Sequence, residues 1–325
     1  MRALVVTIDT EEEGRWSSEY PAMGNTCRNV ERLDRIHRIF TKLGVVPTYL
    51  VDYPVATDPR AREIIAGFAA GGASEIGAHL HPWCNPPFGA DGTPQNTYTY
   101  PHNLPRETQR MKLDHLCRAI EEGIGIKPVS YRAGRWGFGH STVPVLEELG
   151  IQVDTSVTPL WWDTSEGGPV FAKAPLTPYR LNSSDACRPG GSSVVEVPTS
   201  SLVVGGHGRA IERMVRMVGP APGLRRWLVR MGLRSLRPEK FTFDEMKGLS
   251  DAIAARGMRI FNLTFHSSVA LPGATPFVVD EEQLDAFCGR LEAILEHILA
   301  RHQATPIPLA RVPAFLGDAI LRGQG

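Results

Sequence analysis

Ionisable side chains follow several apolar segments of this sequence, at the points where those segments end. The stretch EIGAHLHPW contains His79 and His81, and the stretch ALVVTID ends in Asp9, with Glu11 two residues later. Alternate side chains of a strand point to the same face, so both imidazoles are expected to point the same way. Imidazole nitrogens and a carboxylate oxygen suit zinc or a similar divalent ion. The sequence therefore predicts a metal site formed by His79, His81 and Glu11, and the use of Asp9 as ligand in place of Glu11 stays open.

Three further strand ends carry polar groups suited to acid–base chemistry: Arg132, Asp154 and His266. We expect Asp9 to act as general base toward an attacking water and His266 to protonate the leaving group. Asp154 is expected to orient His266, and Arg132 to keep Asp9 ionised by charge pairing. Such a set suits hydrolysis of an acyl C–N or C–O bond. The competing interpretation is that these are ordinary strand-end residues bonded to the backbone or to one another.

Apolar segments rich in β-branched residues alternate with segments of helical periodicity along the chain. Strands are expected at 3–9, 45–51, 74–80, 128–133, 151–154, 193–198 and 258–266. Helices are expected at 29–43, 105–122, 141–149 and 280–300, with a further helix beginning at the capping-box pattern of Thr242 and Glu245. This alternation predicts a parallel sheet, and the number of strands favours one domain closed or nearly closed into a barrel. In a barrel the carboxyl ends of the strands meet, which would bring the ionisable groups together.

The composition argues against several classes of protein. The 325 residues carry 35 Lys or Arg and 35 Asp or Glu, so no excess of positive charge indicates nucleic acid or membrane as the main partner. The first residues do not have the pattern of a signal peptide, and no apolar run approaches the length of a membrane span. The five cysteines form no CxxC pair. We expect a cytoplasmic protein with free thiols.

Two segments interrupt the alternation within what we expect to be a single domain of residues 1–325. Residues 157–192 are rich in Pro, Gly, Ser and Trp and are expected to form a long ordered loop. Residues 209–240 contain nine Arg or Lys and two Glu among apolar residues, and they are expected to form a basic two-helix insertion. This insertion either covers the barrel or makes a peripheral contact with an anionic glycan or a membrane surface.

Five motifs, in order, resemble those of the polysaccharide deacetylases, the NodB-like proteins of the carbohydrate esterase family 4 superfamily. They are TIDTEE at 7–12, EIGAHLHPW at 75–83, YRAGRWG at 131–137, VDTSV at 153–157 and LTFHSS at 263–268. The stretch FHSSVALPGATPF is also similar to a WalW-like branch found near bacterial surface-polysaccharide genes. The resemblance implies an α/β fold, a distorted (β/α)7 barrel of the glycoside hydrolase/deacetylase type.

The resemblance also implies an activity, which is metal-dependent removal of an N-acetyl or other acyl group from a sugar or a surface-polysaccharide precursor. The implied catalytic residues, in the roles given above, are Asp9, Arg132, Asp154 and His266. The implied ligands of a divalent ion, expected to be zinc, are Glu11, His79 and His81. Aromatic faces stack on sugar rings, and four tryptophans near the motifs are candidates for lining the cleft: Trp83, Trp136, Trp161 and Trp162.

The sequence departs from the family pattern at two places. Thr10 stands where the family has a second aspartate, and Glu11 follows it. The histidines are two residues apart instead of four, and Trp83 stands four residues after His79. An allantoinase-like branch of the same superfamily also has a glutamate-rich first motif, and likeness to it implies metal-independent hydrolysis of a small amide. A third alternative is a catalytically silent glycan-binding barrel, against which the combination of an acid and a base argues.

Overall fold

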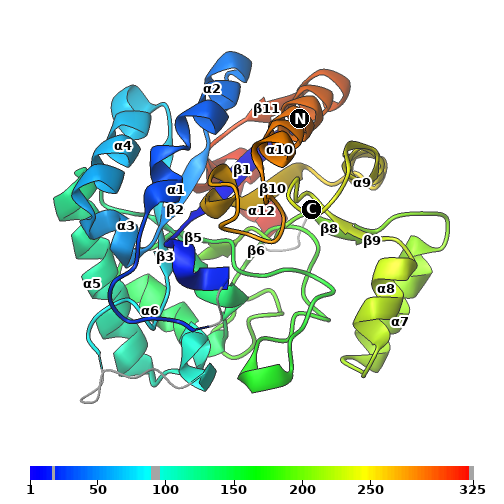
Figure 1. Ribbon diagram of the computed structural model, residues 1–325. Coiled ribbons are helices and arrows are strands. Elements are labelled where there is room, and N and C mark those ends of the chain that lie inside the picture. The colour runs from blue at the N-terminus through cyan, green and yellow to red at the C-terminus, as the bar shows by residue number, and fades with distance from the viewer. Residues whose placement is uncertain (17–18, 89–95, 322–325) are drawn as a thin grey trace.

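The computed structural model describes residues 1–16, 19–88 and 96–321 (Figure 1). Within them, seven parallel strands follow one another across the main sheet. In spatial order they are β10 (Ile260–His266), β1 (Arg2–Thr10), β2 (Thr48–Val51), β3 (Glu75–Leu80), β4 (Ser130–Ala133), β5 (Val153–Asp154) and β7 (Val195–Glu196). Strand β6 (Tyr179–Arg180) pairs antiparallel with β7, and β11 (Ala304–Pro306) pairs parallel with β1. Each strand expected from the apolar segments overlaps one strand of the parallel series.

The two ends of this series meet through the residues that follow β7. The side-chain Nδ2 of Asn262 in β10 donates to the carbonyl of Val197 at 3.1 Å, and the N–H of Ser200 donates to the Asn262 carbonyl at 3.3 Å. The sheet is therefore curled into a distorted barrel, and the fold class expected from the sequence is confirmed.

Helices cover the outside of the curled sheet (Figure 1). They are α1 (Arg28–Glu31), α2 (Asp34–Leu43), α3 (Tyr53–Thr57), α4 (Pro59–Ala69), α5 (Arg106–Ile124), α6 (Val143–Glu148), α9 (Phe243–Ala255) and α10 (Glu281–His302). The C-terminal helices α11 (Val312–Leu316) and α12 (Asp318–Leu321) instead pack against the inner face, at the amino end of the barrel. Short 3-10 helices are η1 (Glu13–Trp16), η2 (Ala70–Gly72), η3 (Asn96–Thr99), η4 (Pro101–Asn103), η5 (Gly134–Trp136), η6 (His140–Thr142), η7 (Ser165–Gly167), η8 (Ser267–Ala270) and η9 (Leu309–Arg311). The capping box of Thr242 and Glu245 begins α9, and Gly44 ends α2 in the left-handed conformation.

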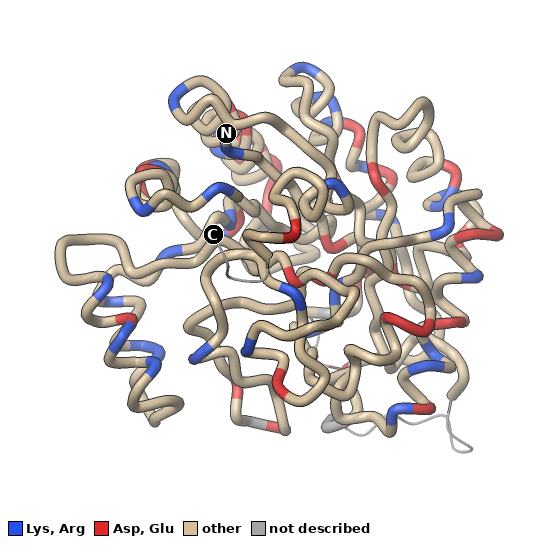
Figure 2. Tube along the Cα trace, turned by 180° about the vertical axis from the view of Figure 1, so that it is seen from behind, with Lys and Arg blue, Asp and Glu red and all other residues tan. Residues whose placement is uncertain are grey.

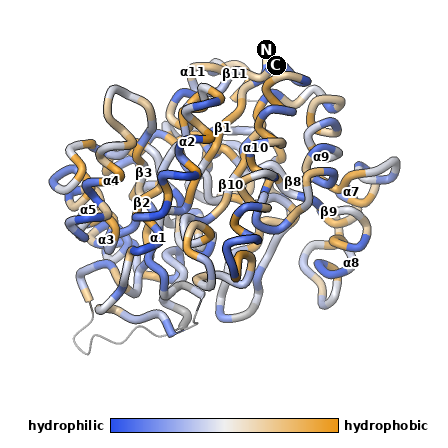
Figure 3. The backbone as a smooth tube through the Cα atoms, turned by 45° about the horizontal axis from the view of Figure 1, so that its top comes forward, coloured by the Kyte–Doolittle hydropathy of each residue, from blue (hydrophilic) through white to orange (hydrophobic). Residues whose placement is uncertain are grey.

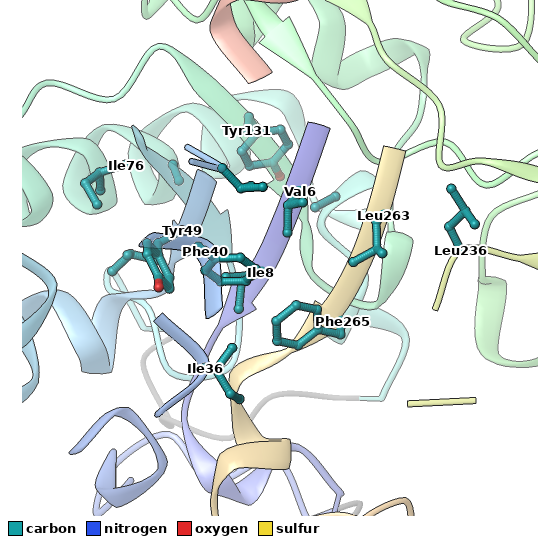
Figure 4. Close-up of a cluster of buried hydrophobic side chains, with 14 of the residues drawn as sticks. Val6, Ile8, Ile36, Phe40, Tyr49, Ile76, Tyr131, Leu236, Leu263 and Phe265 are labelled. Atoms are coloured by element: carbon teal, nitrogen blue, oxygen red, sulfur yellow. The ribbon is translucent and has the colours of Figure 1, made fainter. Parts of the chain in front are cut away.

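Side chains of β1 alternate between two apolar environments because successive strand residues point to opposite faces. Val6 and Ile8 face the helices and pack with residues such as Phe40 of α2 and Phe265 of β10 (Figure 4). The other face of β1 carries Ala3 and Val5 at the amino end, inside an apolar cluster closed by the C-terminal helices. Continuing along this inner face, the side chains become polar, at Thr7 and Asp9. The barrel interior is thus apolar at one end and polar at the other, where the carboxyl ends of the strands lie.

Residues 201–235 form a hairpin outside the barrel. Strands β8 (Ser201–Val203) and β9 (Leu233–Ser235) pair antiparallel, and between them lie α7 (Gly208–Val218) and α8 (Leu224–Arg230). These two helices stand at one side of the molecule, away from the barrel (Figure 1). In the parts of the chain that the structure describes, no helix combines the length and the apolar character needed to cross a bilayer.

Candidate active site

Three side chains converge at the carboxyl ends of β1 and β3. The Oε2 atom of Glu11, just after β1, lies 3.4 Å from Nε2 of His79 and 3.3 Å from Nε2 of His81. All three residues are about 1 % exposed. The second carboxylate oxygen of Glu11 and Nε2 of His81 have no hydrogen-bond partner within the described residues. Buried ligand atoms that lack partners fit a divalent cation, and two imidazoles with one carboxylate suit zinc with positions left for water and substrate.

Both imidazoles present the same nitrogen to Glu11 because the other nitrogen is engaged. The Nδ1 atom of His79 lies 3.0 Å from the carbonyl of Arg132, and Nδ1 of His81 lies 2.8 Å from Oε2 of Glu12. An N–H donated to each of these oxygens leaves the Nε2 lone pair free for a metal. Burial lowers the pKa of His79, which keeps that imidazole neutral. No role was predicted for Glu12 from the sequence, because it is one of three consecutive glutamates and was considered part of an acidic cluster.

Glu12 also ties Trp83 into this site. The Trp83 Nε1–H donates to Oε1 of Glu12 at 2.9 Å, and its ring stacks on His81 with the centroids 4.2 Å apart. Trp83 is fully buried, so its predicted role in lining a substrate cleft is wrong. The backbone N–H of Glu12 donates to Asp52 at 2.8 Å. Burial and the neighbouring Glu12 carboxylate hold the pKa of Asp52 well above its usual range, so that Asp52 stays protonated beside the ionised Glu12.

Asp9 lies next to these groups on the inner face of β1. Its Oδ1 accepts a hydrogen bond from Nη1 of Arg132, whose guanidinium also donates to the Thr155 carbonyl at 2.9 Å and to Oγ1 of Thr7 at 2.8 Å. Burial raises the pKa of Asp9, but the charges of Arg132 and the nearby histidines outweigh burial and lower it. The structure therefore brings Arg132 and Asp9 together, as expected, and keeps Asp9 ionised.

His266, the last residue of β10, faces Asp9 across the site. Its Nε2 atom lies 3.7 Å from Oδ2 of Asp9. Its Nδ1 atom lies 3.0 Å from Oε1 and 3.1 Å from Oε2 of Glu239, which also accepts from the His266 backbone N–H at 3.1 Å. Arg237 forms an ion pair with the same carboxylate. Although burial raises the pKa of Glu239, His266 and Arg237 lower it far below its usual range, so Glu239 is an anion.

The expected pairing of Asp154 with His266 is wrong, because Asp154 lies on the other face of the sheet. Asp154 is in register with Tyr131 of β4, which packs in the outer core beneath the helices, whereas Val153 points into the barrel. Its carboxyl group accepts a hydrogen bond from Oγ of Ser156 at 2.6 Å. Asp154 is also in register with Glu196 of β7, and the two carboxyl groups are hydrogen-bonded to each other. The role of Glu239 was not predicted from the sequence, because this residue follows the hairpin and does not lie at the end of an expected strand.

The remaining tryptophans occupy different environments. The ring of Trp136 lies 4.8 Å from the Arg132 guanidinium and 5.7 Å from that of Arg237, so Trp136 borders the acid–base pair and stays a candidate for substrate contact. Trp162 is largely buried in an apolar cluster with residues of α7 and α8, and it also borders a hollow that Arg225 and Arg226 line, so its role in substrate contact stays a prediction. Trp161 is half-buried with the Arg225 guanidinium 5.7 Å from its ring, and its role stays a prediction.

One aromatic residue that the sequence analysis did not select lies against the proposed acid. The ring of Trp16 meets the imidazole of His266 edge to face, with the centroids 5.1 Å apart, and its Nε1–H donates to Oγ of Ser268 at 3.1 Å. Trp16 also lines a hollow of about 870 Å3 together with Glu13, Arg28 and the loop after η8. Trp16 lies four residues after the end of the first motif, and this closeness in sequence could have identified it as a residue of the site.

No protein-family model matches the sequence, and no curated protein matches it. Several solved structures resemble the chain. A protein from Mycobacterium smegmatis described as a polysaccharide deacetylase is 17 % identical, with 96 % of this chain and 89 % of that chain covered and a TM-score of 0.57. Puue allantoinase is 17 % identical over 95 % of this chain and 89 % of its own, with a TM-score of 0.55. A Pseudomonas aeruginosa protein described as a polysaccharide deacetylase is 16 % identical, with 95 % of this chain and 89 % of that chain covered and a TM-score of 0.53. The chain therefore shares the barrel fold of proteins described as polysaccharide deacetylases and of an allantoinase.

Proposed function

We propose that this protein is a hydrolase that removes an N-acetyl or other acyl group from a sugar unit of a glycan or glycan precursor. The observation that carries the proposal is the position of Asp9 and His266. Their facing atoms lie 3.7 Å apart beside the group formed by Glu11, His79 and His81. The side chains of His266 and Asp9 are 9 % and 4 % exposed, against 0–2 % for the group behind them. Substrate would therefore reach the acid and the base first.

The chain's own residues supply both proton transfers of such a reaction. Asp9, ionised and fixed through Oδ1 by Arg132, would accept a proton on Oδ2 from the water that attacks the acyl carbon. His266, in its protonated form, would donate from Nε2 to the nitrogen or oxygen that leaves when the acyl bond breaks. The anionic Glu239 would stabilise the imidazolium and hold its ring in place.

Glu11, His79 and His81 would hold a divalent ion, most simply zinc, with Glu12 and the Arg132 carbonyl fixing the two rings. Such an ion, when bound, would polarise the acyl oxygen and make the attacking water more acidic. Glu11 is the better third ligand, because Asp9 is already engaged with Arg132.

The test combines elemental analysis with acetate release from acetylated sugars. We expect the purified protein to carry a stoichiometric divalent ion, to lose activity on chelation and to regain it with zinc or cobalt. The double variant His79→Ala with His81→Ala should fold but hold no metal. His115→Ala with His140→Ala, two exposed histidines, is the matched control and should behave as the wild type. A metal-free protein that releases acetate through chelation would overturn the metal part, and a metal-loaded protein inactive on all acetylated sugars would overturn the deacetylase part.

A second candidate, metal-independent hydrolysis of a small amide, is favoured by the surroundings of His81. Burial lowers the pKa of His81, but the carboxylates of Glu12 and Glu11 outweigh burial and raise it to about 10. A protonated His81 would balance both carboxylates without a cation. Under this candidate, His79 and His81 are hydrogen-bonding groups, and the protein hydrolyses small amides at an unchanged rate in the presence of a chelator.

A further inference from the structure

The hairpin helices α7 and α8, with the residue that follows α8, expose large apolar side chains that no other described part of the chain covers. Five such residues lie within one stretch, and their exposed fractions are 72 % for Met217, 62 % for Val218, 38 % for Trp227, 47 % for Val229 and 41 % for Met231. The opposite side of the same helices is packed, because Val215 and Leu228 are fully buried in a cluster with Leu160 and Trp162. The exposed residues therefore belong to an ordered surface.

The same surface carries positive charge that no carboxylate of the hairpin balances. Arg209, Arg213, Arg226 and Arg230 are exposed on α7 and α8. Figure 2 shows several Lys or Arg positions along this hairpin. Within residues 205–234, all of which the structure describes, the single acidic residue is Glu212. Glu212 is buried, and its carboxylate is bound to Arg256 and to the N–H of Val203. No carboxylate of the hairpin is thus left to balance these four guanidinium groups.

Two other arginines attach the hairpin to the loop that follows β5. Arg216 donates to the carbonyl of Ala174 at 2.8 Å, and Arg225 donates to the carbonyl of Trp162 at 2.9 Å. On this adjoining loop, Asp163 accepts a hydrogen bond from the Tyr100 hydroxyl at 3.2 Å. The helices are therefore held against the body of the protein on one side and present mixed basic and apolar residues on the other.

We propose that the α7–α8 hairpin docks this protein on the surface of an anionic phospholipid bilayer. Arginines would lie at the level of the lipid phosphates, and the apolar side chains between them would enter the boundary between headgroups and acyl chains. Figure 3 shows hydrophobic and hydrophilic stretches side by side along both helices. A soluble polyanion would use the arginines alone and would leave the exposed Met, Val and Trp in water, so the combination favours a membrane.

Docking at this place would orient the candidate active site. The chain leaves β9 at Ser235 and reaches Arg237 and Glu239, the residues that hold His266. The hairpin is therefore continuous with the wall of the site that carries the proposed acid. Binding of the hairpin to a bilayer does not depend on the reaction that the protein catalyses, and it is measured without turnover.

The experiment is co-sedimentation of the whole protein with phosphatidylcholine vesicles that contain or lack phosphatidylglycerol. We expect binding to the anionic vesicles at low salt, weaker binding at high salt, and little binding to phosphatidylcholine alone. Arg226→Glu with Arg230→Glu should reduce partitioning by at least about tenfold, since each basic residue near the surface contributes roughly fivefold. Lys127→Glu with Arg311→Glu, both exposed outside the hairpin, changes the net charge equally and should leave binding intact.

The apolar part is tested by a second variant, Met217→Ser with Val218→Ser, which keeps every charge. It should weaken binding to anionic vesicles several-fold while leaving the circular-dichroism melting curve unchanged, because both side chains are exposed. Absence of wild-type binding to anionic vesicles at low salt would overturn the proposal. The proposal would also be overturned if the charge reversals outside the hairpin reduced vesicle binding as much as the charge reversals within it. Retention on an anionic polysaccharide with no binding to vesicles would instead assign the surface to a glycan.

Discussion

The carboxylate of Glu239 lies 3.0 Å from Nδ1 of His266, on the side of the imidazole opposite the nitrogen that faces Asp9. Arg237, two residues before Glu239, pairs with the same carboxylate, and the His266 backbone N–H donates to it as well. These contacts fix the ring so that Nε2 points into the site. Glu239 thus occupies the position of the orienting carboxylate that the sequence analysis gave to Asp154.

Glu239→Gln is predicted to lower turnover by roughly 10–100-fold, the usual cost of losing an orienting partner. The amide keeps the shape of the side chain but cannot balance a protonated imidazole. Metal content should stay at the wild-type level, because Glu239 does not touch Glu11, His79 or His81. Turnover on an acetylated sugar and elemental analysis of the same preparation measure the two effects.

Glu281→Gln is the matched control, since Glu281 is an exposed residue whose ion pair with Arg32 lies on the outside of the barrel. It should leave turnover and metal content unchanged. If Glu239→Gln is as active as this control, Glu239 has no positioning role. If the loss of turnover follows a loss of folded protein in circular dichroism, the role of Glu239 is only structural.

Gly134→Ala is predicted to weaken metal binding by displacing His81. A Cβ atom at Gly134 would come into steric conflict with Cδ2 of His81 and with the backbone carbonyl of Leu80, and that carbonyl belongs to the sheet and cannot move aside. The imidazole must therefore shift, and we expect metal affinity to fall roughly 10–100-fold. Competition with a chromogenic chelator measures the affinity. Gly67→Ala in α4, where nothing lies within 4 Å of the new atom, should leave it unchanged. Equal affinities in the two variants would contradict the prediction.

Period-two patterns made much of the fold and half of the site predictable. Apolar strand segments located the parallel series, and the spacings of Asp9 with Glu11 and of His79 with His81 placed four side chains on inner faces. The predicted pairing of Asp154 with His266 was wrong because the end of a strand places a residue near the rim of the barrel but does not show which face of the sheet its side chain occupies. The faces of β5 are fixed by its register with β4, which is a long-range property.

Two residues of the site have no periodic signal at all. Glu12 reaches His81 from the residue after Glu11, and Glu239 reaches His266 from a segment that follows the hairpin. Both contacts depend on how a connecting segment returns to the barrel, which tertiary packing decides. A glutamate in an acidic run or a polar loop has the appearance of a solvated residue until that packing is known.

Trp83→Phe tests the corrected position of Trp83. Phenylalanine can keep the stacking on His81, but it cannot donate to Oε1 of Glu12, so a buried carboxylate oxygen loses its donor. We expect the free energy of unfolding to fall by about 1–3 kcal/mol, as for other buried groups left unsatisfied. The KM for an acetylated sugar should not rise, because Trp83 is fully buried. Denaturant unfolding and steady-state kinetics measure the two quantities. A raised KM at unchanged stability would support the original prediction that Trp83 contacts the substrate.

The carboxyl pair of Asp154 and Glu196 predicts a specific dependence of stability on pH. Burial, and then the neighbouring Asp154, hold the pKa of Glu196 well above its ordinary value of 4.5, and burial also raises the pKa of Asp154. Between about pH 4.5 and its raised pKa, Glu196 is protonated in the folded chain but ionised in the unfolded one. The contribution of Glu196 to stability is therefore fully present below about pH 4.5 and is lost as the pH rises, by about 1.4 kcal/mol per pH unit.

Glu196→Gln removes this titration while its amide oxygen can still accept from the N–H of Val157, which lies 3.1 Å from Oε1 in the wild type. We expect the free energy of unfolding of the variant, relative to the wild type, to increase as the pH rises above about 5 and to level off once Glu196 ionises in the folded wild type. Urea denaturation at a series of pH values measures it. Glu121→Gln, an exposed glutamate of α5, should give a curve parallel to the wild type. A parallel curve for Glu196→Gln would mean that Glu196 is ionised in the folded protein, and the buried pair would then need a cation that holds both charges.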